Sequence, residues 1–176
     1  MAMMATMRGI PQIFAGDELM FVSNRPDNIG DHPGRRVDFP GGWAGDEIDL
    51  FTAEGREAQT YNTDGLKVEK GQAADLFNYV SRLFQWRKTA DVIHNGKTMH
   101  FMTRDNTYAY FRYNDEAAVF VYINNNLEPV NVPWSYYSEI TEGLQGGVDV
   151  LTGEPVEISD ATVVAPKTAL VVEFKR

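Results

Sequence analysis

Residues 30–43, GDHPGRRVDFPGGW, gather the side chains of this sequence that are best suited to hold a polar ligand. The guanidinium of Arg36 can donate several hydrogen bonds in a fixed geometry, and the carboxylate of Asp31 can accept from two neighbouring hydroxyls. The stretch contains too many glycines and prolines for a helix or a central strand. It is therefore either a binding loop or a linker that carries charges.

Other kinds of site are not indicated. The three histidines lack the spacing of zinc ligands. Asp27, Asn28 and Asp31 could contribute oxygens to calcium, but they do not follow the EF-hand pattern. We therefore interpret these side chains as solvated and expect no metal or cofactor, with a calcium site as the alternative. With no cysteine, the chain forms no disulfide and has no catalytic thiol. A net charge of −9 disfavours nucleic acid and anionic membranes as partners.

The sequence does not predict a membrane segment or a leader. No apolar run approaches the roughly 18 residues of a membrane-spanning helix. The N-terminus, MAMMATMRGIPQIF, has no basic residue ahead of its apolar part, so we do not interpret it as a signal peptide.

Three elements are expected in the first half of the chain. Residues 9–14 form an apolar run that suits a buried strand, and residues 23–43 form a long loop. Residues 72–91 place Ala73, Leu76, Phe77, Val80 and Leu83 on one helical face. One strand cannot bury itself, so this half resembles the last piece of a larger α/β unit.

The second half of the chain predicts an antiparallel β-sandwich. Short aromatic or β-branched runs at residues 97–104, 107–113 and 117–124 are separated by turn residues. Further runs follow at residues 148–151, 156–158, 162–165 and 168–174, with no long helix between them. The predicted fold is therefore mainly β, with a domain boundary near residue 92.

Several motifs in order resemble the C-terminal part of glycoside hydrolase family 13, the α-amylase family, and most closely its neopullulanase and cyclomaltodextrinase group. They are RGIPQIFAGDEL, GDHPGRRVDFPGGW, LFNYVSRLFQWRKTADVIHNGK, AVFVYINNN and DVLTGE. The resemblance implies that residues 1–92 are the end of a truncated (β/α)₈ barrel, with its last strand, a long loop and its last helix. Residues 93–176 are implied to be the β-sandwich that follows the barrel.

The resemblance also implies site residues. Loops after barrel strands line the active site, so residues 30–43 are expected at the substrate cleft. Pro33 and Arg36 keep the family's Pro-x-x-Arg spacing, but His32 stands where the family has aspartate, with Asp31 one position earlier. The substrate-binding candidates are Asp31, His32, Arg36, Asp38, Phe39 and Trp43.

Each candidate has a structural alternative. Arg36 and Asp38 could pair with each other to hold the loop. Phe39 and Trp43 could stack on a sugar ring, or Trp43 could anchor the loop to the barrel. Likewise, the aromatic run at residues 134–137 is expected in the sandwich core, with a surface carbohydrate site as the alternative.

The implied function is that of a C-terminal fragment of a retaining α-glucan hydrolase acting on starch, maltooligosaccharides, cyclodextrins or pullulan. The family's three catalytic carboxylates would lie upstream of Met1, so the chain alone is expected to be inactive and to contribute no catalytic residue. A stand-alone carbohydrate-binding or structural module is the alternative. The apolar faces left without a barrel favour a homodimer, and a periplasmic or cell-surface parent enzyme is consistent with starch uptake.

Overall fold

The computed structural model describes residues 1–21, 45 and 71–176. Its contacts divide the chain into two compact units. The first consists of Met1–Pro11 with Arg82–Arg176, and the second of Gln12–Ser81. The domain boundary predicted near residue 92 separates the barrel from the β-sandwich of a longer enzyme, and it stays a prediction.

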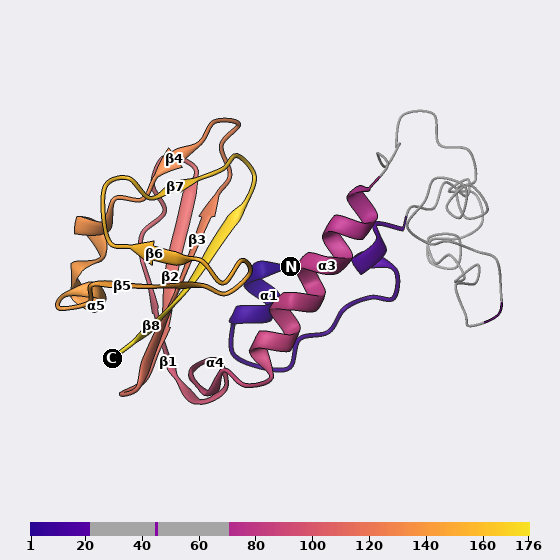
Figure 1. Ribbon diagram of the computed structural model, residues 1–176, viewed down its shortest axis with the longest axis horizontal. Coiled ribbons are helices and arrows are strands. Elements are labelled where there is room, and N and C mark those ends of the chain that lie inside the picture. The colour runs from indigo at the N-terminus through magenta and orange to yellow at the C-terminus, as the bar shows by residue number, and fades with distance from the viewer. Residues whose placement is uncertain (22–44, 46–70) are drawn as a thin grey trace. The chain divides into compact units, whose positions relative to one another are not determined.

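An antiparallel sheet dominates the first unit (Figure 1). Its strands lie in the order β1 (Lys97–His100), β2 (Thr107–Tyr113), β3 (Ala117–Asn124), β8 (Ala169–Lys175), β5 (Gly146–Asp149) and β6 (Pro155–Glu157). A second sheet pairs β4 (Val130–Asn131) with β7 (Val163–Val164). Every pairing is antiparallel, which confirms the predicted antiparallel β domain.

One face of the long strands carries the main core. β3 alternates, so Phe120 and Tyr122 face this core while Val119 and Val121 face the other side. A 3₁₀-helix, η3 (Trp134–Tyr137), and a short helix, α5 (Ser138–Thr141), contribute to the same core. In Figure 1, β5 and β6 run across the long strands, so the curling sheet supplies part of its own second layer.

Close packing requires a glycine where the sheet folds onto itself. A side chain at Gly147 on β5 would place its Cβ 2.7 Å from Val172 Cγ1 and 2.8 Å from Phe174 Cδ1. These separations are shorter than van der Waals contact, so β5 approaches β8 only because residue 147 has no side chain.

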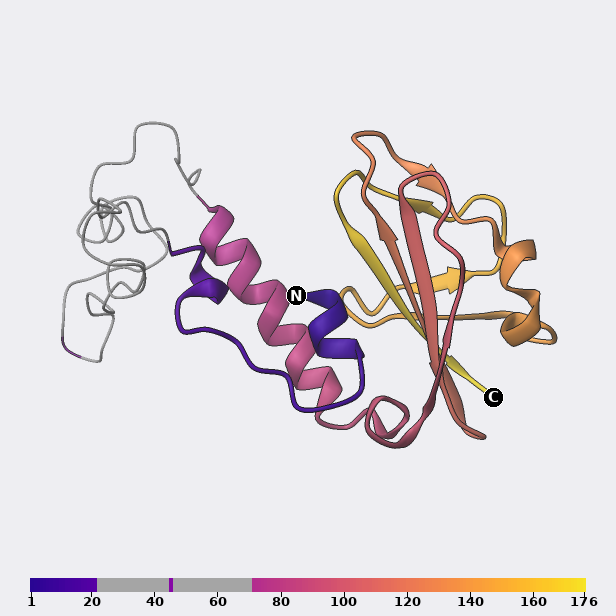
Figure 2. The same cartoon turned by 180° about the vertical axis from the view of Figure 1, so that it is seen from behind.

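Short helices pack on the other face of the sheet. In α1 (Ala2–Thr6), the Thr6 hydroxyl is 2.5 Å from the Tyr110 hydroxyl on β2. In α4 (Asp91–Asn95), Val92 and Ile93 are buried, and Figure 2 shows α4 directly before β1. The sequence pattern did not indicate these helices as a cover for the sheet, because elements of one or two turns have no measurable periodicity.

The predicted long helix is present as α3 (Gln72–Arg87). Ala73, Val80 and Leu83 on the predicted apolar face are buried, whereas Phe77 remains 39% exposed. The helix ends at Arg87 instead of Asp91. There, the Thr89 and Ala90 amides bond three residues back instead of four, which tightens and ends the last turn.

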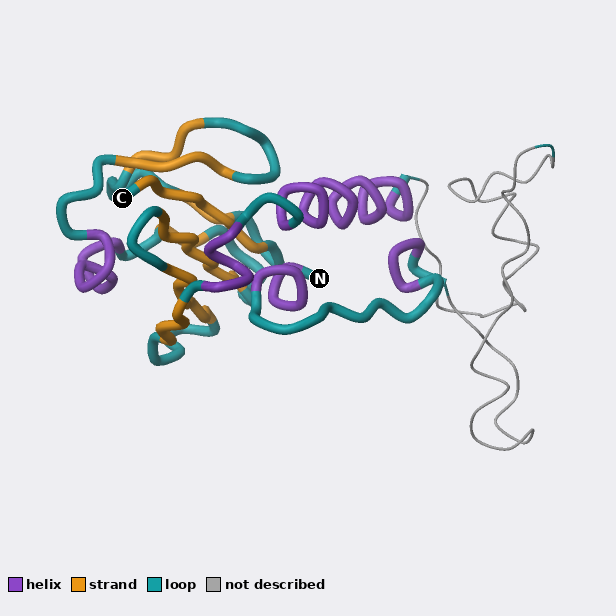
Figure 3. The backbone as a smooth tube through the Cα atoms, turned by 90° about the horizontal axis from the view of Figure 1, so that it is seen from below, coloured by secondary structure: helices purple, strands orange, loops and turns teal. Residues whose placement is uncertain are grey.

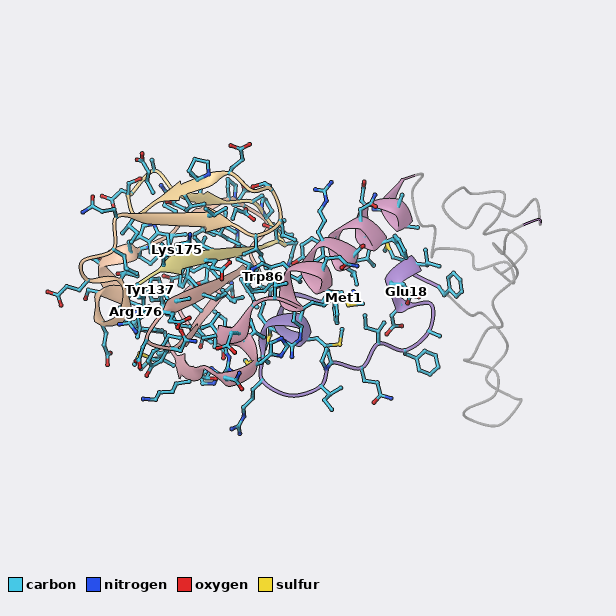
Figure 4. The ribbon with its side chains drawn as sticks, turned by 60° about the horizontal axis from the view of Figure 1, so that its bottom comes forward. Met1, Glu18, Trp86, Tyr137, Lys175 and Arg176 are labelled. Atoms are coloured by element: carbon cyan, nitrogen blue, oxygen red, sulfur yellow. The ribbon has the colours of Figure 1, made fainter. Side chains whose placement is uncertain are left out.

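The last turn of α3 is attached to the sheet. Trp86, which is labelled in Figure 4, donates through Nε1 to Glu173 Oε2 on β8 over 3.0 Å. This bond joins two residues of the first unit that are distant in the sequence.

The strand expected at residues 10–14 is not present in the structure, so this prediction is wrong. The segment is drawn as loop in Figure 3, with Ile10 97% and Phe14 55% exposed. A strand needs a neighbour to pair its backbone groups, and in the described part of the chain no strand pairs with this segment. It leads into a 3₁₀-turn, η1 (Asp17–Leu19), where Glu18 Oε2 accepts a 3.0 Å hydrogen bond from the Gly16 amide.

Candidate functional site

The substrate-binding candidates of the sequence lie outside the described residues. Asp31, His32, Arg36, Asp38, Phe39 and Trp43 all belong to residues 22–44. The same holds for Asp27 and Asn28. The structure therefore does not test their roles, and they stay predictions.

Two general searches cover only the described residues. Within residues 1–21, 45 and 71–176, no three histidine, aspartate or glutamate side chains converge as metal ligands. Over the same part of the chain, no helix has the length and apolar character needed to cross a membrane.

A pocket lies where the β1–β2 connection meets the end of β3. Its volume is about 340 Å³, and it is lined by residues 103–108 together with Ile123 and Asn125. This volume is at the lower end of the range for small-molecule sites. The lining includes hydroxyl and amide groups, the tyrosine ring of Tyr108 and two opposite charges, on Arg104 and Asp105.

The turn beneath this pocket is held on both sides. Asp105 and Asn106 have φ values of 45° and 54°, the left-handed region that Asn and Asp tolerate better than most residues. The Asn126 side chain donates to Asp105 O over 2.8 Å, and the Asn125 amide donates to Asn106 O over 3.0 Å. Because these bonds come from the loop after β3, a segment distant in the sequence fixes this turn.

A row of rings borders the same site. The rings of His100 and Tyr108 are stacked with centroids 6.1 Å apart, and Tyr110 lies next to both. Nδ1 of His100 is 2.5 Å from the Tyr108 hydroxyl. Burial raises the pKa of Tyr108, so the phenol keeps its proton at neutral pH and can donate a hydrogen bond.

The aromatic run at residues 134–137 is mainly core, as expected. Trp134 and Tyr137 are each 4% exposed, and Trp134 Nε1 donates to Thr162 Oγ1 over 3.0 Å. Burial, with smaller effects of neighbouring tyrosines, raises the pKa of Tyr137. Tyr136 is only partly buried, and the Arg104 guanidinium lies 4.2 Å from its ring centroid.

Two buried arginines hold backbone carbonyls. Arg87 donates to Ala5 O, Met7 O and Gly9 O at 2.5, 3.1 and 2.7 Å. Arg112, 1% exposed, donates to Ile93 O over 2.8 Å and to the Thr98 hydroxyl. Burial, followed by the neighbouring charges of Arg8 and Arg87, lowers the pKa of Arg112. Both side chains therefore act as structural clamps.

Sequence reasoning did not find the pocket. The Asp105-Asn106 pair was interpreted only as turn chemistry between two strands. The missing information is the position of Asn125 and Asn126, which are close to that turn only in the folded sheet. The sequence signal for this contact is the pair of asparagines, Asn125 and Asn126, directly after a predicted strand.

Comparison with known families gives one match in sequence. The model of the cyclo-malto-dextrinase C-terminal domain matches residues 98–173. This interval begins in β1 and ends in β8, so it contains the six-stranded sheet except for the first residue of β1 and the last two of β8.

Solved structures match nearly the whole chain. An α-amylase from Anoxybacillus aligns over 99% of this chain and 31% of its own length, with a TM-score of 0.61 and 16% identity. An α-amylase from Geobacillus thermoleovorans, complexed with acarbose, aligns over 99% of this chain and 32% of its own length, with a TM-score of 0.62 and 14% identity. AmyP in complex with maltotriose aligns over 98% of this chain and 33% of its own length, with a TM-score of 0.59 and 18% identity.

This chain therefore spans about a third of the length of the enzymes it matches. At such identities the structural likeness concerns the fold alone. Residues 98–173 match the model of the cyclo-malto-dextrinase C-terminal domain, and the chain has the fold of the C-terminal part of α-amylases.

Proposed function

We propose that this chain supplies the C-terminal part of an enzyme that acts on α-glucans such as maltooligosaccharides, starch, cyclodextrins or pullulan. The observation that carries the proposal is the match of nearly the whole chain to about a third of an α-amylase, together with the family match over the sheet. In this proposal residues 1–92 are the end of the catalytic barrel and residues 93–176 the domain after it.

The exposed segment at residues 10–14 supports this assignment. Ile10 is 97% exposed, and no strand in the described part of the chain pairs with residues 10–14. In a barrel, the preceding and first strands would pair its backbone and cover its side chains. The helix α3 would then be the last outer helix of that barrel.

The loop candidates take their roles within this proposal. Arg36, Asp31 and His32 would contact sugar hydroxyls, and Phe39 would stack on a ring. Asp38 would orient Arg36, and Trp43 would fix the loop. A homodimer through uncovered apolar side chains remains a further proposal, since Ile10 and Phe14 are exposed.

Hydrolysis is expected to need residues beyond this chain. A retaining glycosidase needs two carboxyl groups about 5–5.5 Å apart. The resemblance assigns these groups to barrel strands that precede the segments present here. Purified chain incubated with maltoheptaose, pullulan or β-cyclodextrin is therefore expected to release no reducing ends above a heat-treated control; turnover that follows the purified protein would contradict the proposal.

A chimera tests the proposed role directly. The matching C-terminal third of the Geobacillus thermoleovorans α-amylase is replaced by this chain. We expect the chimera to be a soluble enzyme that hydrolyses maltoheptaose. We expect the amylase truncated at the same point, with nothing in place of its C-terminal third, to be insoluble or inactive. A chimera no better than the truncated amylase would be evidence against the assignment.

A further inference from the structure

We propose that the pocket beside the β1–β2 turn is a binding site for a short α-glucan segment, formed by other residues than those of the loop at residues 30–43. The inference rests on the proposed function for the ligand's class, but its location comes from the structure alone. The pocket of about 340 Å³ is lined by residues 103–108, Ile123 and Asn125.

The chemistry of the lining favours a neutral, hydroxyl-rich ligand. Threonine and asparagine side chains supply both donors and acceptors, as a sugar requires. The charges of Arg104 and Asp105 cancel formally, so the pocket does not select an anion or a cation by net charge. The ring of Tyr108 adds the flat apolar surface on which the C–H groups of a sugar can pack.

The site is rigid before any ligand arrives. Within the turn, Arg104 and Thr107 exchange backbone hydrogen bonds of 3.2 and 2.6 Å, and the Thr107 hydroxyl donates to Arg104 O over 2.7 Å. Asn126 and Asn125 hold the turn from the loop after β3. A preformed site loses little conformational entropy on binding, which favours weak ligands such as sugars.

The aromatic wall is equally fixed. Tyr108 is bonded through its hydroxyl to His100 and lies against the His100 ring at an interplanar angle of 11°. Arg104 is held over the Tyr136 ring, 4.2 Å from its centroid. Two of the side chains that line the pocket, Tyr108 and Arg104, are therefore held in place by neighbouring rings.

Titration of the isotope-labelled full chain with maltotriose tests the site by NMR. We expect amide shifts confined to residues 103–108, Ile123 and Asn125, with cellotriose giving clearly smaller shifts because its linkage presents the hydroxyls differently. Thr103→Ala and Tyr108→Ala should each weaken binding about tenfold, the effect of losing roughly 1.4 kcal/mol of contact energy. Thr152→Ala, an exposed threonine in another turn, should bind as the unchanged chain does.

Tyr108→Ala also removes the contact with His100, whereas Thr103→Ala changes an exposed position and keeps the test informative. The inference would be overturned if maltotriose shifted no amides, or shifted amides outside the pocket. It would also be overturned if Thr103→Ala bound maltotriose as the unchanged chain does, or if cellotriose bound equally well. An active chimera without pocket binding would leave the proposed function standing. An inactive chimera would refute that function whatever the titration gives.

Discussion

Replacing Arg87 by alanine is expected to lower the free energy of unfolding by about 3 kcal/mol, because a buried guanidinium that donates to three carbonyls is lost. The carbonyls of Ala5, Met7 and Gly9 end the short helix α1 and the turn after it. That helix has only five residues, so it depends on tertiary contacts for its formation. Urea unfolding monitored by circular dichroism measures the change.

Two matched variants separate the clamp from a general effect on α3. Arg82→Ala removes an exposed arginine from the same helix and should leave stability within about 0.5 kcal/mol of the unchanged chain. Arg87→Lys should be intermediate, because lysine keeps the charge but lacks the planar fork that reaches three acceptors.

Hydrogen exchange provides the local measurement. In Arg87→Ala the amides of Ala5 and Met7, which bond to Met1 O and Met3 O, should exchange faster relative to amides of β3. Equal acceleration in both regions, or no loss of stability, would show that Arg87 does not hold α1.

Some elements were predictable because their determinants are local. The runs at residues 107–113 and 117–124 match β2 and β3, since aromatic and β-branched residues there are bounded by strong turn residues. The position of α3 follows from its apolar periodicity. These patterns need no knowledge of the rest of the chain.

Other elements were not predictable, because their determinants are distant. β4 has only two residues, and it exists because β7 pairs with it across a long interval. The apolar segment at residues 10–14 has strand character, but no strand among the described residues pairs with it. Strand character and strand formation are therefore different properties, and the local sequence of this segment indicates only the first.

The candidate sites differ in the same way. The loop at residues 30–43 stands out by residue type, and its interpretation came from the order of motifs around it. The pocket at the β1–β2 turn has ordinary residue types, and its existence depends on the approach of Asn125 and Asn126 to Asp105 and Asn106. Such a site can be recognised only after folding.

Asn124 at the end of β3 joins segments that no local pattern connects. Its side chain is fully buried, and Nδ2 lies 2.9, 3.1 and 3.0 Å from the carbonyl oxygens of Glu128, Val164 and Ala165. Its Oδ1 accepts hydrogen bonds of 2.9 and 3.0 Å from the backbone and side chain of Asn126. An amide is the only uncharged side chain of this size that offers donors on one side and an acceptor on the other.

Asn124→Asp is expected to destabilise the fold by about 4 kcal/mol at pH 7, with almost no change in side-chain shape. The new carboxylate would face three carbonyl oxygens, so the folded state would favour its protonated form and raise its pKa. Holding an ordinary aspartate protonated at pH 7 costs about 1.36 kcal/mol for each pH unit above its usual pKa of about 3.9, which gives this magnitude.

The sign of the pH dependence distinguishes this cause from simple loss of packing. A group whose pKa is raised by folding binds its proton more tightly in the folded state, so stability falls as pH rises above about 3.9. The stability difference between Asn124→Asp and the unchanged chain should therefore be small near pH 4 and should widen towards pH 7.

Asn125→Asp is the matched control, because its side chain is exposed and its Oδ1 accepts from Lys167 Nζ over 2.9 Å. The new charge there would pair with the lysine, and we expect a change within about 0.5 kcal/mol. A difference for Asn124→Asp that does not depend on pH would contradict the argument, because a cavity or a lost contact has no proton to exchange. The polar junction at Asn124 would then stabilise the fold by its shape rather than by the direction of its hydrogen bonds.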